Sequence, residues 1–264
     1  MTRLRVLAID TSTEACSAAL LWSDGEVRER FIVTERGHAD LILPMIDGLL
    51  AEAGCKLKDL DGLAFGRGPG GFTGLRIAAG VIQGLAYGAG LRVAPVSSLA
   101  AVAFLATSYS SSSPSLPSGP SWPSCPSSPS GPSCPSSPSS AVLVCNDARM
   151  NEVYWGCYRF DPGDPCVPIL LTPETVGPAD RVQPAPAVAH FAGNGIPRYP
   201  ALRARLEAAG LSCHEGLYPR ASAVARLGEP MLQRGEGVDA AAALPVYIRD
   251  DVARPARPPV TGLS

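Results

Sequence analysis

The chain has 264 residues, 46% of them hydrophobic and 17% charged, so it can build one large or two small domains with a sizeable core. Its formal net charge of −2 argues against a protein that binds a nucleic-acid backbone strongly on its own, because such proteins carry a basic face. No apolar run is long enough for a membrane span, and no signal-peptide pattern opens the sequence, so we expect a cytoplasmic protein.

Residues 1–107 have the pattern of a mixed α/β domain. Strands are predicted at 5–10, 16–22 and 26–34, and a helix at 39–53, where apolar residues recur at helical spacing. A short strand at 63–65 runs into a glycine-rich loop, and a helix capped by Thr73 extends from there to about Gly90. A strand at 92–96 and a helix at 98–106 complete this part.

Residues 108–140 are almost only Ser and Pro, with Pro at every third position from 114 to 138. A three-residue period matches polyproline II, and a segment without charge and almost without apolar residues cannot form a core. We expect a disordered insertion that the fold tolerates. The alternative is a ligand for a proline-recognising module.

Residues 141–264 form a second part of the same kind. Strands are predicted at 141–145, 152–160 and 188–192, with a turn at 146–151, and helices at 199–209 and 220–233. Two consecutive halves of mixed strands and helices predict an α/β protein of two similar domains, followed by a C-terminal tail.

The loop "FGRGPGGFTGLR" (65–76) has the composition of a phosphate-binding turn. It lacks the Lys of a P-loop, and its Gly-x-Gly-x-x-Gly match lacks the following acid of a dinucleotide fold, since no Asp or Glu occurs between Asp61 and Asp147. The same gap removes a local acid for holding Mg²⁺. What remains is a turn before a helix, where N–H groups near Gly68, Gly70 and Gly71 could face an anion.

A second candidate for phosphate binding is the run Asp10, Thr11, Ser12 and Thr13 at the end of the first strand. An acid followed by hydroxyls and a hairpin is the first phosphate loop of the actin- and hexokinase-like ATPases. The structural alternative has equal weight, because Asp and Thr often tie a turn together by bonding its backbone.

Metal catalysis is disfavoured by the residue types. The three histidines, His38, His190 and His214, form no His-x-x-x-His pair, and the eight cysteines form no Cys-x-x-Cys pair. We therefore expect no metal site and reduced thiols, with His38 as a helix cap or surface contact.

The helix after the glycine loop carries Gly80, Gly84 and Gly88 four residues apart, which makes one bare ridge. Each glycine inside a helix costs ~1 kcal/mol relative to alanine, so the ridge needs a structural reason. The close approach of another helix is one reason, and that helix belongs either to this chain or to a second protein.

Together these stretches resemble the TsaB family, the bacterial subunit of tRNA threonylcarbamoyladenosine biosynthesis. The segments that carry the resemblance are "LAIDTSTEACSAAL" (7–20), "HADLILPMIDGLLAEAG" (38–54), "KDLDGLAFGRGPGGFTGLRIAAGVIQGLAYG" (58–88), "PVSSLAA" (95–101), "DARMNEVYWGCY" (147–158) and "LPVYIRDDVA" (244–253). The likeness covers almost everything outside 108–140.

The resemblance implies an actin-like (ASKHA) fold of two similar α/β domains and a non-catalytic role. It implies dimerisation with the paralogue TsaD, which transfers the threonylcarbamoyl group, and a larger complex with the ATPase TsaE that contacts tRNA. TsaD carries a His-x-x-x-His metal pair where this chain reads "SSLAA" (97–101). The implied interface lies on the first two helices. The residues expected there are Leu41, Ile42, Met45, Ile46, Leu49, Arg76, Ile77, Gly80, Val81, Gly84 and Gly88.

The resemblance implies no required cofactor, and weak ATP or ADP binding by the two loops stays open. Two other hypotheses also stay open. One is an enzyme, either a metallopeptidase or an ASKHA kinase, against which the missing metal pair and the acid-free span count. The other is a homodimer that senses nucleotide, which co-elution with TsaD would distinguish.

Overall fold

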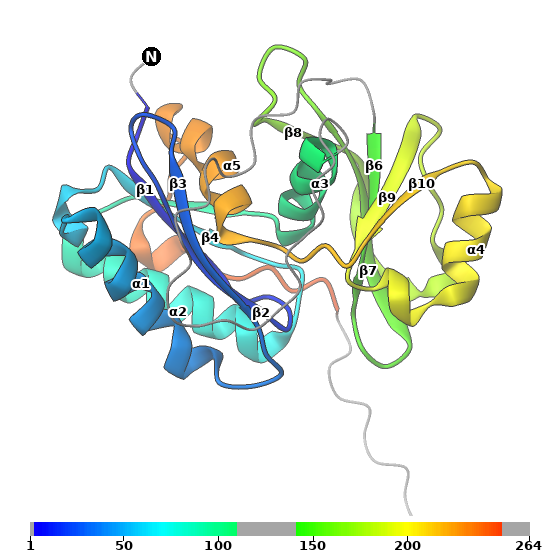
Figure 1. The fold of residues 1–264 in the computed structure, drawn as a ribbon, viewed down its shortest axis with the longest axis horizontal. Coiled ribbons are helices and arrows are strands. Elements are labelled where there is room, and N and C mark those ends of the chain that lie inside the picture. The colour runs from blue at the N-terminus through cyan, green and yellow to red at the C-terminus, as the bar shows by residue number, and fades with distance from the viewer. Residues whose placement is uncertain (1–2, 110–140, 250–264) are drawn as a thin grey trace, which may run out of the picture.

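The computed structural model describes residues 3–109 and 141–249 (Figure 1). Almost all of the Ser/Pro-rich segment therefore lies outside the described residues, as do residues 250–264. Among the described residues, no helix combines the length and hydropathy needed to cross a membrane.

The first lobe is built on a five-stranded sheet with the order β3-β2-β1-β4-β5. Its strands are β1 (Val6–Asp10), β2 (Ala15–Leu21), β3 (Val27–Val33), β4 (Gly62–Gly66) and β5 (Val93–Val96). β1 pairs antiparallel with β2 and parallel with β4, so every residue of this central strand is buried. Every strand predicted in this part of the sequence is present.

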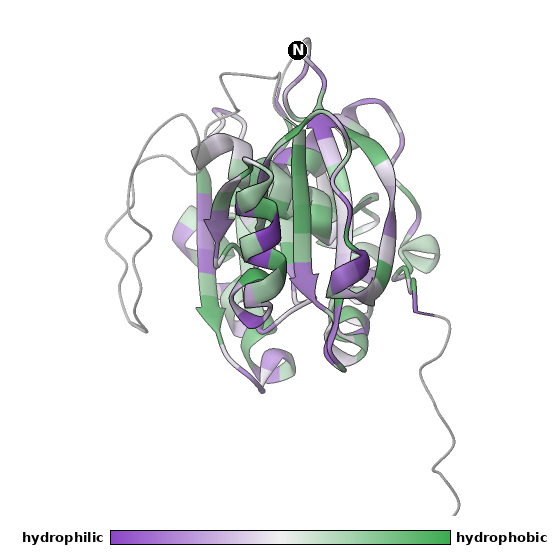
Figure 2. Cartoon of the chain, turned by 90° about the vertical axis from the view of Figure 1, so that its right-hand side faces the viewer, coloured by the Kyte–Doolittle hydropathy of each residue, from purple (hydrophilic) through white to green (hydrophobic). Residues whose placement is uncertain are grey.

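The second lobe repeats this topology. Its strands are β6 (Ala141–Asp147), β7 (Glu152–Phe160), β8 (Pro168–Pro178), β9 (Val188–Gly193) and β10 (Ser212–Glu215), in the order β10-β9-β6-β7-β8. β6 pairs antiparallel with β7 and parallel with β9, as β1 does with β2 and β4. Figure 2, which looks at this lobe, shows mostly hydrophobic residues along the middle of the sheet. The predicted α/β fold of two similar domains is confirmed.

The helices form three layers around the two sheets (Figure 1). α1 (His38–Ala53) and α2 (Phe72–Ala89) cover the outer face of the first sheet, where they share a core with β1 and β4. α4 (Pro200–Ala208) covers the outer face of the second sheet. α3 (Ser98–Tyr109) and α5 (Ala221–Gln233) lie between the sheets.

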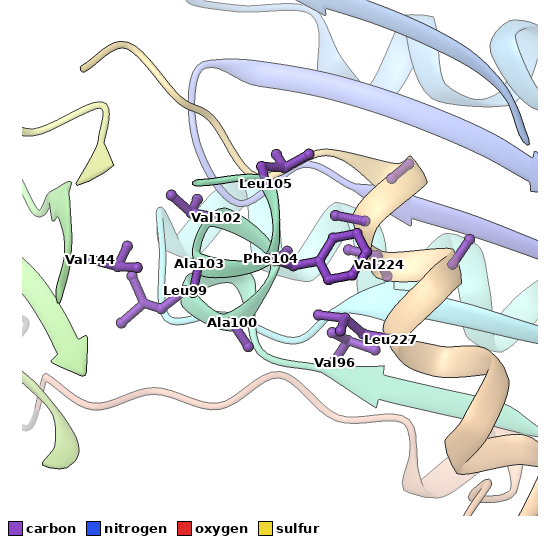
Figure 3. Packing of buried hydrophobic residues seen from close by; sticks show 14 of the residues in the cluster. Val96, Leu99, Ala100, Val102, Ala103, Phe104, Leu105, Val144, Val224 and Leu227 are labelled. Carbon is purple, nitrogen blue, oxygen red and sulfur yellow. The ribbon is translucent and has the colours of Figure 1, made fainter. Parts of the chain in front are cut away.

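The central core joins the two lobes. Phe104 of α3 points toward Val224 and Leu227 of α5, and Leu99 of α3 points toward Val144 of β6 (Figure 3). Each of these five side chains is at most 1% exposed. Because α3 is apolar on every side, it can fill the space between two other layers of the fold.

The predicted second domain, residues 141–264, contains elements that pack on the sheet of the first lobe. α5 packs on β1, β2, β4 and β5 of the first sheet, and Val238 pairs with Val93 at the edge of that sheet. α5 and residues 238–246 therefore pack on the first lobe, although the sequence assigned them to the second. An amphipathic helix shows that it covers a sheet, but its pattern does not say which sheet.

Some local predictions also differ from the structure. β8 and β10 were missed: β8 contains three prolines within Pro168–Pro178, and β10 has only four residues. Both are edge strands, where proline and short length are tolerated. The N-cap of α2 is Gly71 and not Thr73, and α3 runs past the predicted end at 106 to Tyr109.

Candidate functional site

Residues 10–13 at the end of β1 form an acidic loop, in which the Asp10 carboxylate accepts hydrogen bonds from the loop itself. The Ser12 amide and hydroxyl donate to Asp10 Oδ1 at 2.9 and 2.7 Å, and the Ser98 hydroxyl donates to Asp10 Oδ2 at 3.1 Å. The Asp10 side chain is fully buried, and burial raises the pKa of its carboxyl, while these hydrogen bonds lower it. Thus both carboxylate oxygens are used inside the chain.

The glycine loop lies directly against this acidic loop. The Gly71 amide donates to the Ser12 carbonyl at 2.7 Å, and the Thr11 hydroxyl donates to the Gly74 carbonyl at 2.7 Å. A Cβ atom at Gly74 would lie 1.9 Å from the Thr11 carbonyl oxygen, so only glycine permits this approach. The glycines that suggested a phosphate loop therefore allow the two loops to pack closely against each other.

The structure brings Gly70 and Gly71 against Ser12, next to Asp10, so most of the residues predicted to bind phosphate lie together. Asp10, Thr11, Ser12 and Gly68 are buried, Thr13 and Gly70 are half-buried, and Gly71 is exposed. Donors and acceptors of several of them are already paired with one another. An anion bound by these same groups would have to replace hydrogen bonds that the chain makes to itself, each worth about 1 kcal/mol.

In the first lobe the Asp10 side chain, at the end of the central strand, lies against Gly66. The second lobe has the same arrangement, with the Asn146 amide in place of the carboxylate and Gly193 in place of Gly66. A Cβ at Gly66 would lie 1.8 Å from Asp10 Oδ2, and a Cβ at Gly193 would lie 2.7 Å from Asn146 Oδ1. Both polar side chains are buried at the end of the central strand of their sheet. Asn146 was not predicted from the sequence. The repeated pattern of a strand, a polar residue and a later strand ending in glycine could have located it.

Polar side chains tie the two lobes together near these loops. The Asn194 side chain donates to Glu14 Oε2 at 2.9 Å, and Arg198 lies 3.3 Å from Glu14 Oε1. The Tyr154 hydroxyl donates to the Gly70 carbonyl at 3.4 Å. These residues were not singled out from the sequence, because nothing local marks a contact between residues 180 positions apart.

His38 is the first residue of α1, after the N-cap Gly37, and it is half-buried against residues 10–13, so it is neither the helix cap nor a surface contact. Its Nε2 atom lies 3.0 Å from the Thr13 carbonyl, which is the position of a donor to that oxygen. Within the described ranges 3–109 and 141–249, no group of three or more His, Cys, Asp or Glu side chains has the arrangement of a metal site.

The α1 residues of the predicted interface are mostly part of the chain's own core. Ile42, Met45, Ile46 and Leu49 are each no more than 4% exposed and pack on the first sheet. They cannot present their side chains to a partner, so the prediction that these four residues contact one is wrong. Helical periodicity shows that these four residues share a buried face, and the structure shows that this chain alone buries it.

The α2 residues behave differently. We define the α2 face as the exposed residues of this helix that share one side, namely Phe72, Arg76, Gly80, Gly84, Tyr87 and Gly88. A Cβ added at Gly80, Gly84 or Gly88 meets no atom within 4 Å. The glycine ridge is therefore not covered by the described residues. Leu41, Ile77 and Val81, also predicted for the interface, are half-buried.

The C-terminal segment extends this surface. Leu244 and Tyr247 are 59% and 44% exposed, and the Tyr247 ring lies 5.3 Å from the ring of Phe72. Tyr87 at the other end of α2 is 87% exposed. Large apolar side chains gathered on one exposed face, beside bare backbone, are typical of a surface that binds another protein.

Comparison with known proteins shows which family the chain resembles. The model of a family described as TsaD, tRNA N6-adenosine threonylcarbamoyltransferase, matches residues 32–119, a range that includes α1 and α2. The tRNA threonylcarbamoyladenosine biosynthesis protein TsaB of Escherichia coli K12 is 36% identical over 257 residues, which are 95% of this chain and 96% of that protein.

Two further relatives agree. TsaB of Haemophilus influenzae is 55% identical over 103 residues, 39% of this chain and 43% of that protein. A solved structure described as YeaZ from Pseudomonas aeruginosa has a TM-score of 0.72 and 37% identity, and it covers 92% of this chain and 99% of that one. An identity of 36% that spans almost the whole of both chains establishes common descent, and the chain belongs to the TsaB family of tRNA threonylcarbamoyladenosine biosynthesis proteins.

Proposed function

We propose that this chain is a non-catalytic subunit that docks through its α2 face onto a TsaD-type transferase and is required for forming threonylcarbamoyladenosine in tRNA. Membership of the TsaB family supports involvement in this biosynthesis. The observation that carries the docking is the exposed glycine ridge. Three glycines lower the stability of one helix, and close packing of a partner against them would offset that cost.

A partner with the same fold suits this surface. The transferase family model matches the part of the chain that holds α1 and α2, so a TsaD-type protein would bring a comparable pair of helices. Two such pairs, facing one another, form a four-helix contact in which bare backbone lets the axes approach closely. The ATPase TsaE and the tRNA would then join through the complex.

The loops support a non-catalytic role. Asp10 is the acid that an actin-like ATPase would use for a metal-bound water, and here Ser12 and Ser98 occupy both of its oxygens. Raising the pKa of this carboxyl by burial also disfavours the charged form that a metal ligand needs. These observations favour a structural role for Asp10 over a role in catalysis. Nucleotide binding, if present, would not lead to a reaction.

The test is reconstitution. The TsaD-type paralogue, the ATPase and unmodified tRNA are incubated with and without this chain, and the modified nucleoside is measured by mass spectrometry. We expect product only when the chain is present, and co-elution of the chain with the paralogue. Equal product without the chain would exclude the proposal. ATP or peptide hydrolysis by the chain alone, lost in Asp10→Ala, would point to an enzyme instead.

A further inference from the structure

Five side chains form a polar cluster, which we call the clasp, where the loops of the two lobes meet. Its members are Glu14 of the first lobe and Asp147, Asn194, Arg198 and Tyr199 of the second. The Asn194 side chain donates to Glu14 Oε2 at 2.9 Å, and Arg198 Nη2 donates to Glu14 Oε1 at 3.3 Å. Both carboxylate oxygens of Glu14 are therefore bonded across the boundary between the lobes.

The second lobe holds the residues that receive Glu14 in place. The Asp147 amide donates to Asn194 Oδ1 at 3.1 Å, and the Tyr199 hydroxyl donates to Asp147 Oδ1 at 3.1 Å. Arg198 Nη1 also lies 3.4 Å from Asp147 Oδ2. The side chains of Glu14 and Asp147 are only 18% and 5% exposed, so solvent and salt screen these contacts less than they would a surface ion pair.

Next to the clasp, the second lobe buries an amide that the chain does not satisfy. Asn146 is 1% exposed, and neither its Oδ1 nor its Nδ2 atom has a hydrogen-bond partner among the described residues. In the first lobe, Ser12 lies two residues after Asp10 and bonds it, whereas Ala148 lies two residues after Asn146 and has no hydroxyl. A buried polar group without a partner disfavours the state that buries it.

α3 and the glycine loop lie over the face of the second sheet that carries Asn146. Val144 is two residues before Asn146, so it shares this face of β6, and it lies opposite Leu99 of α3 (Figure 3). Tyr154 is the cross-strand neighbour of Asn146, and its hydroxyl donates to the Gly70 carbonyl of the first lobe at 3.4 Å. Separation of the lobes on the side of the loops would therefore admit water to the Asn146 amide.

We propose that the clasp is a lock: it holds the two lobes closed over Asn146, and its release lets them open on the side of the loops while the core around Phe104 stays packed. The two features act in opposite directions, because the Glu14 contacts exist only in the closed state and the Asn146 amide gains water only in the open state. The glycine loop lies at the same boundary. Any ligand that enters between the loops is therefore bound more weakly, by the factor by which the lock favours the closed state.

The experiment measures how often the boundary opens, through the rate at which a water-soluble thiol reagent labels a buried reporter. Ala148→Cys supplies the reporter in the full-length chain, since Ala148 is 5% exposed and belongs to the core shared by the two lobes. Glu14→Ala in this background should speed labelling about tenfold or more, because hydrogen bonds to a charged group are lost from the closed state alone. Asn146→Val should slow labelling about tenfold, because it removes the unpaired amide. The double variant should label at close to the rate of the reporter chain.

Two controls separate opening from other changes. Cys145 is fully buried on the opposite face of β6, in the core under α4, so mass spectrometry of its labelling reports unfolding of the second lobe. Glu207→Ala removes an exposed carboxylate that pairs with Arg203 on α4, and it should leave the labelling rate within about twofold.

Thermal unfolding of each variant checks that the fold is intact, and Asn146→Ala carries the same expectation if the valine lowers Tm by overpacking. An unchanged labelling rate at position 148 in Glu14→Ala would show that the clasp is no lock. Labelling of Cys145 at the same rate as position 148 would mean that the lobe unfolds, which also overturns the inference. Faster labelling when Asn146 is replaced would show that its amide supports the closed state, contrary to the proposed opposition.

Discussion

Gly84→Leu should stabilise the isolated chain and weaken its complex at the same time. Gly84 lies inside the 18-residue helix α2, and a Cβ there meets no atom within 4 Å. The new side chain therefore causes no clash within the described chain. Few substitutions at an interface have effects of opposite sign on folding and on binding, so this one separates the two sharply.

The gain in folding comes from helix propensity. Glycine is about 0.8–1 kcal/mol less favourable than alanine in a helix interior, and leucine is close to alanine. The free energy of unfolding should therefore rise by roughly 0.5–1 kcal/mol. For a chain of this size, such a gain raises Tm by about 1–4 °C.

The loss in binding comes from overpacking. A leucine side chain on the glycine ridge fills the space through which a second helix would approach. Forcing extra side-chain volume into a packed contact costs about 1–3 kcal/mol, which is roughly a 5- to 150-fold weaker complex.

The assays are urea or thermal unfolding of the chain alone and calorimetric titration with the TsaD-type paralogue. Ala204→Leu is the matched control: it adds a leucine to the exposed side of α4 on the other lobe. It should leave binding unchanged. Unaltered affinity in Gly84→Leu, with the expected rise in stability, would refute the use of the ridge as a contact. A fall in stability would show that the ridge is covered within the chain.

Three further predictions concern the loops and the insertion. Gly74→Ala should destabilise the chain by ~2 kcal/mol or more, whereas Gly84→Ala in the same helix should stabilise it by ~1 kcal/mol. The two differ because a Cβ at Gly74 would lie 1.9 Å from the Thr11 carbonyl oxygen, while a Cβ at Gly84 meets no atom within 4 Å. Equal effects in chemical denaturation would contradict the contact between the loops. Burial raises the folded-state pKa of Asp10, so its charged form opposes folding, and the penalty grows as pH rises from the ordinary carboxyl pKa through the raised one. The stability advantage of Asp10→Asn should therefore increase with pH in denaturation curves, and a constant or shrinking difference would show that the hydrogen bonds to the carboxylate outweigh its burial. Replacing residues 110–140 by a short Gly/Ser linker should leave Tm and tRNA modification unchanged, because their composition cannot form a core; loss of product in the reconstituted reaction would assign the segment a role.

The sequence located most secondary structure in the first lobe, because its periodicities are strong. The alternation and apolar runs of β1 to β3, and the helical spacing in α1 and α2, identified these elements to within a few residues of their observed ends. The two missed strands, β8 and β10, lie at edges of the second sheet, and β8 carries prolines that normally argue against a strand.

The candidate site was predicted in part. The sequence singled out Asp10 and the glycine loop as two separate candidates for phosphate binding. It could not show that Ser12 and Ser98 bond the Asp10 carboxylate. Nor could it show that the glycine loop exchanges hydrogen bonds with Thr11 and Ser12. It also grouped Ile42 with Gly84 in one interface, whereas Ile42 is buried in its own chain and Gly84 is exposed. Periodicity reveals that a helix has an apolar face; it does not reveal whose atoms cover that face.

Composition and local patterns by themselves determined the α/β class, the duplication into two similar halves and the bare ridge on α2, because backbone preference and side-chain spacing act over a few residues. The tertiary structure alone decided that α5 returns to the first sheet, that Asp10 is enclosed by Ser12 and Ser98, and that Leu244 and Tyr247 lie beside Arg76. Each of these depends on contacts between distant parts of the chain, which form only when the layers pack around a common core.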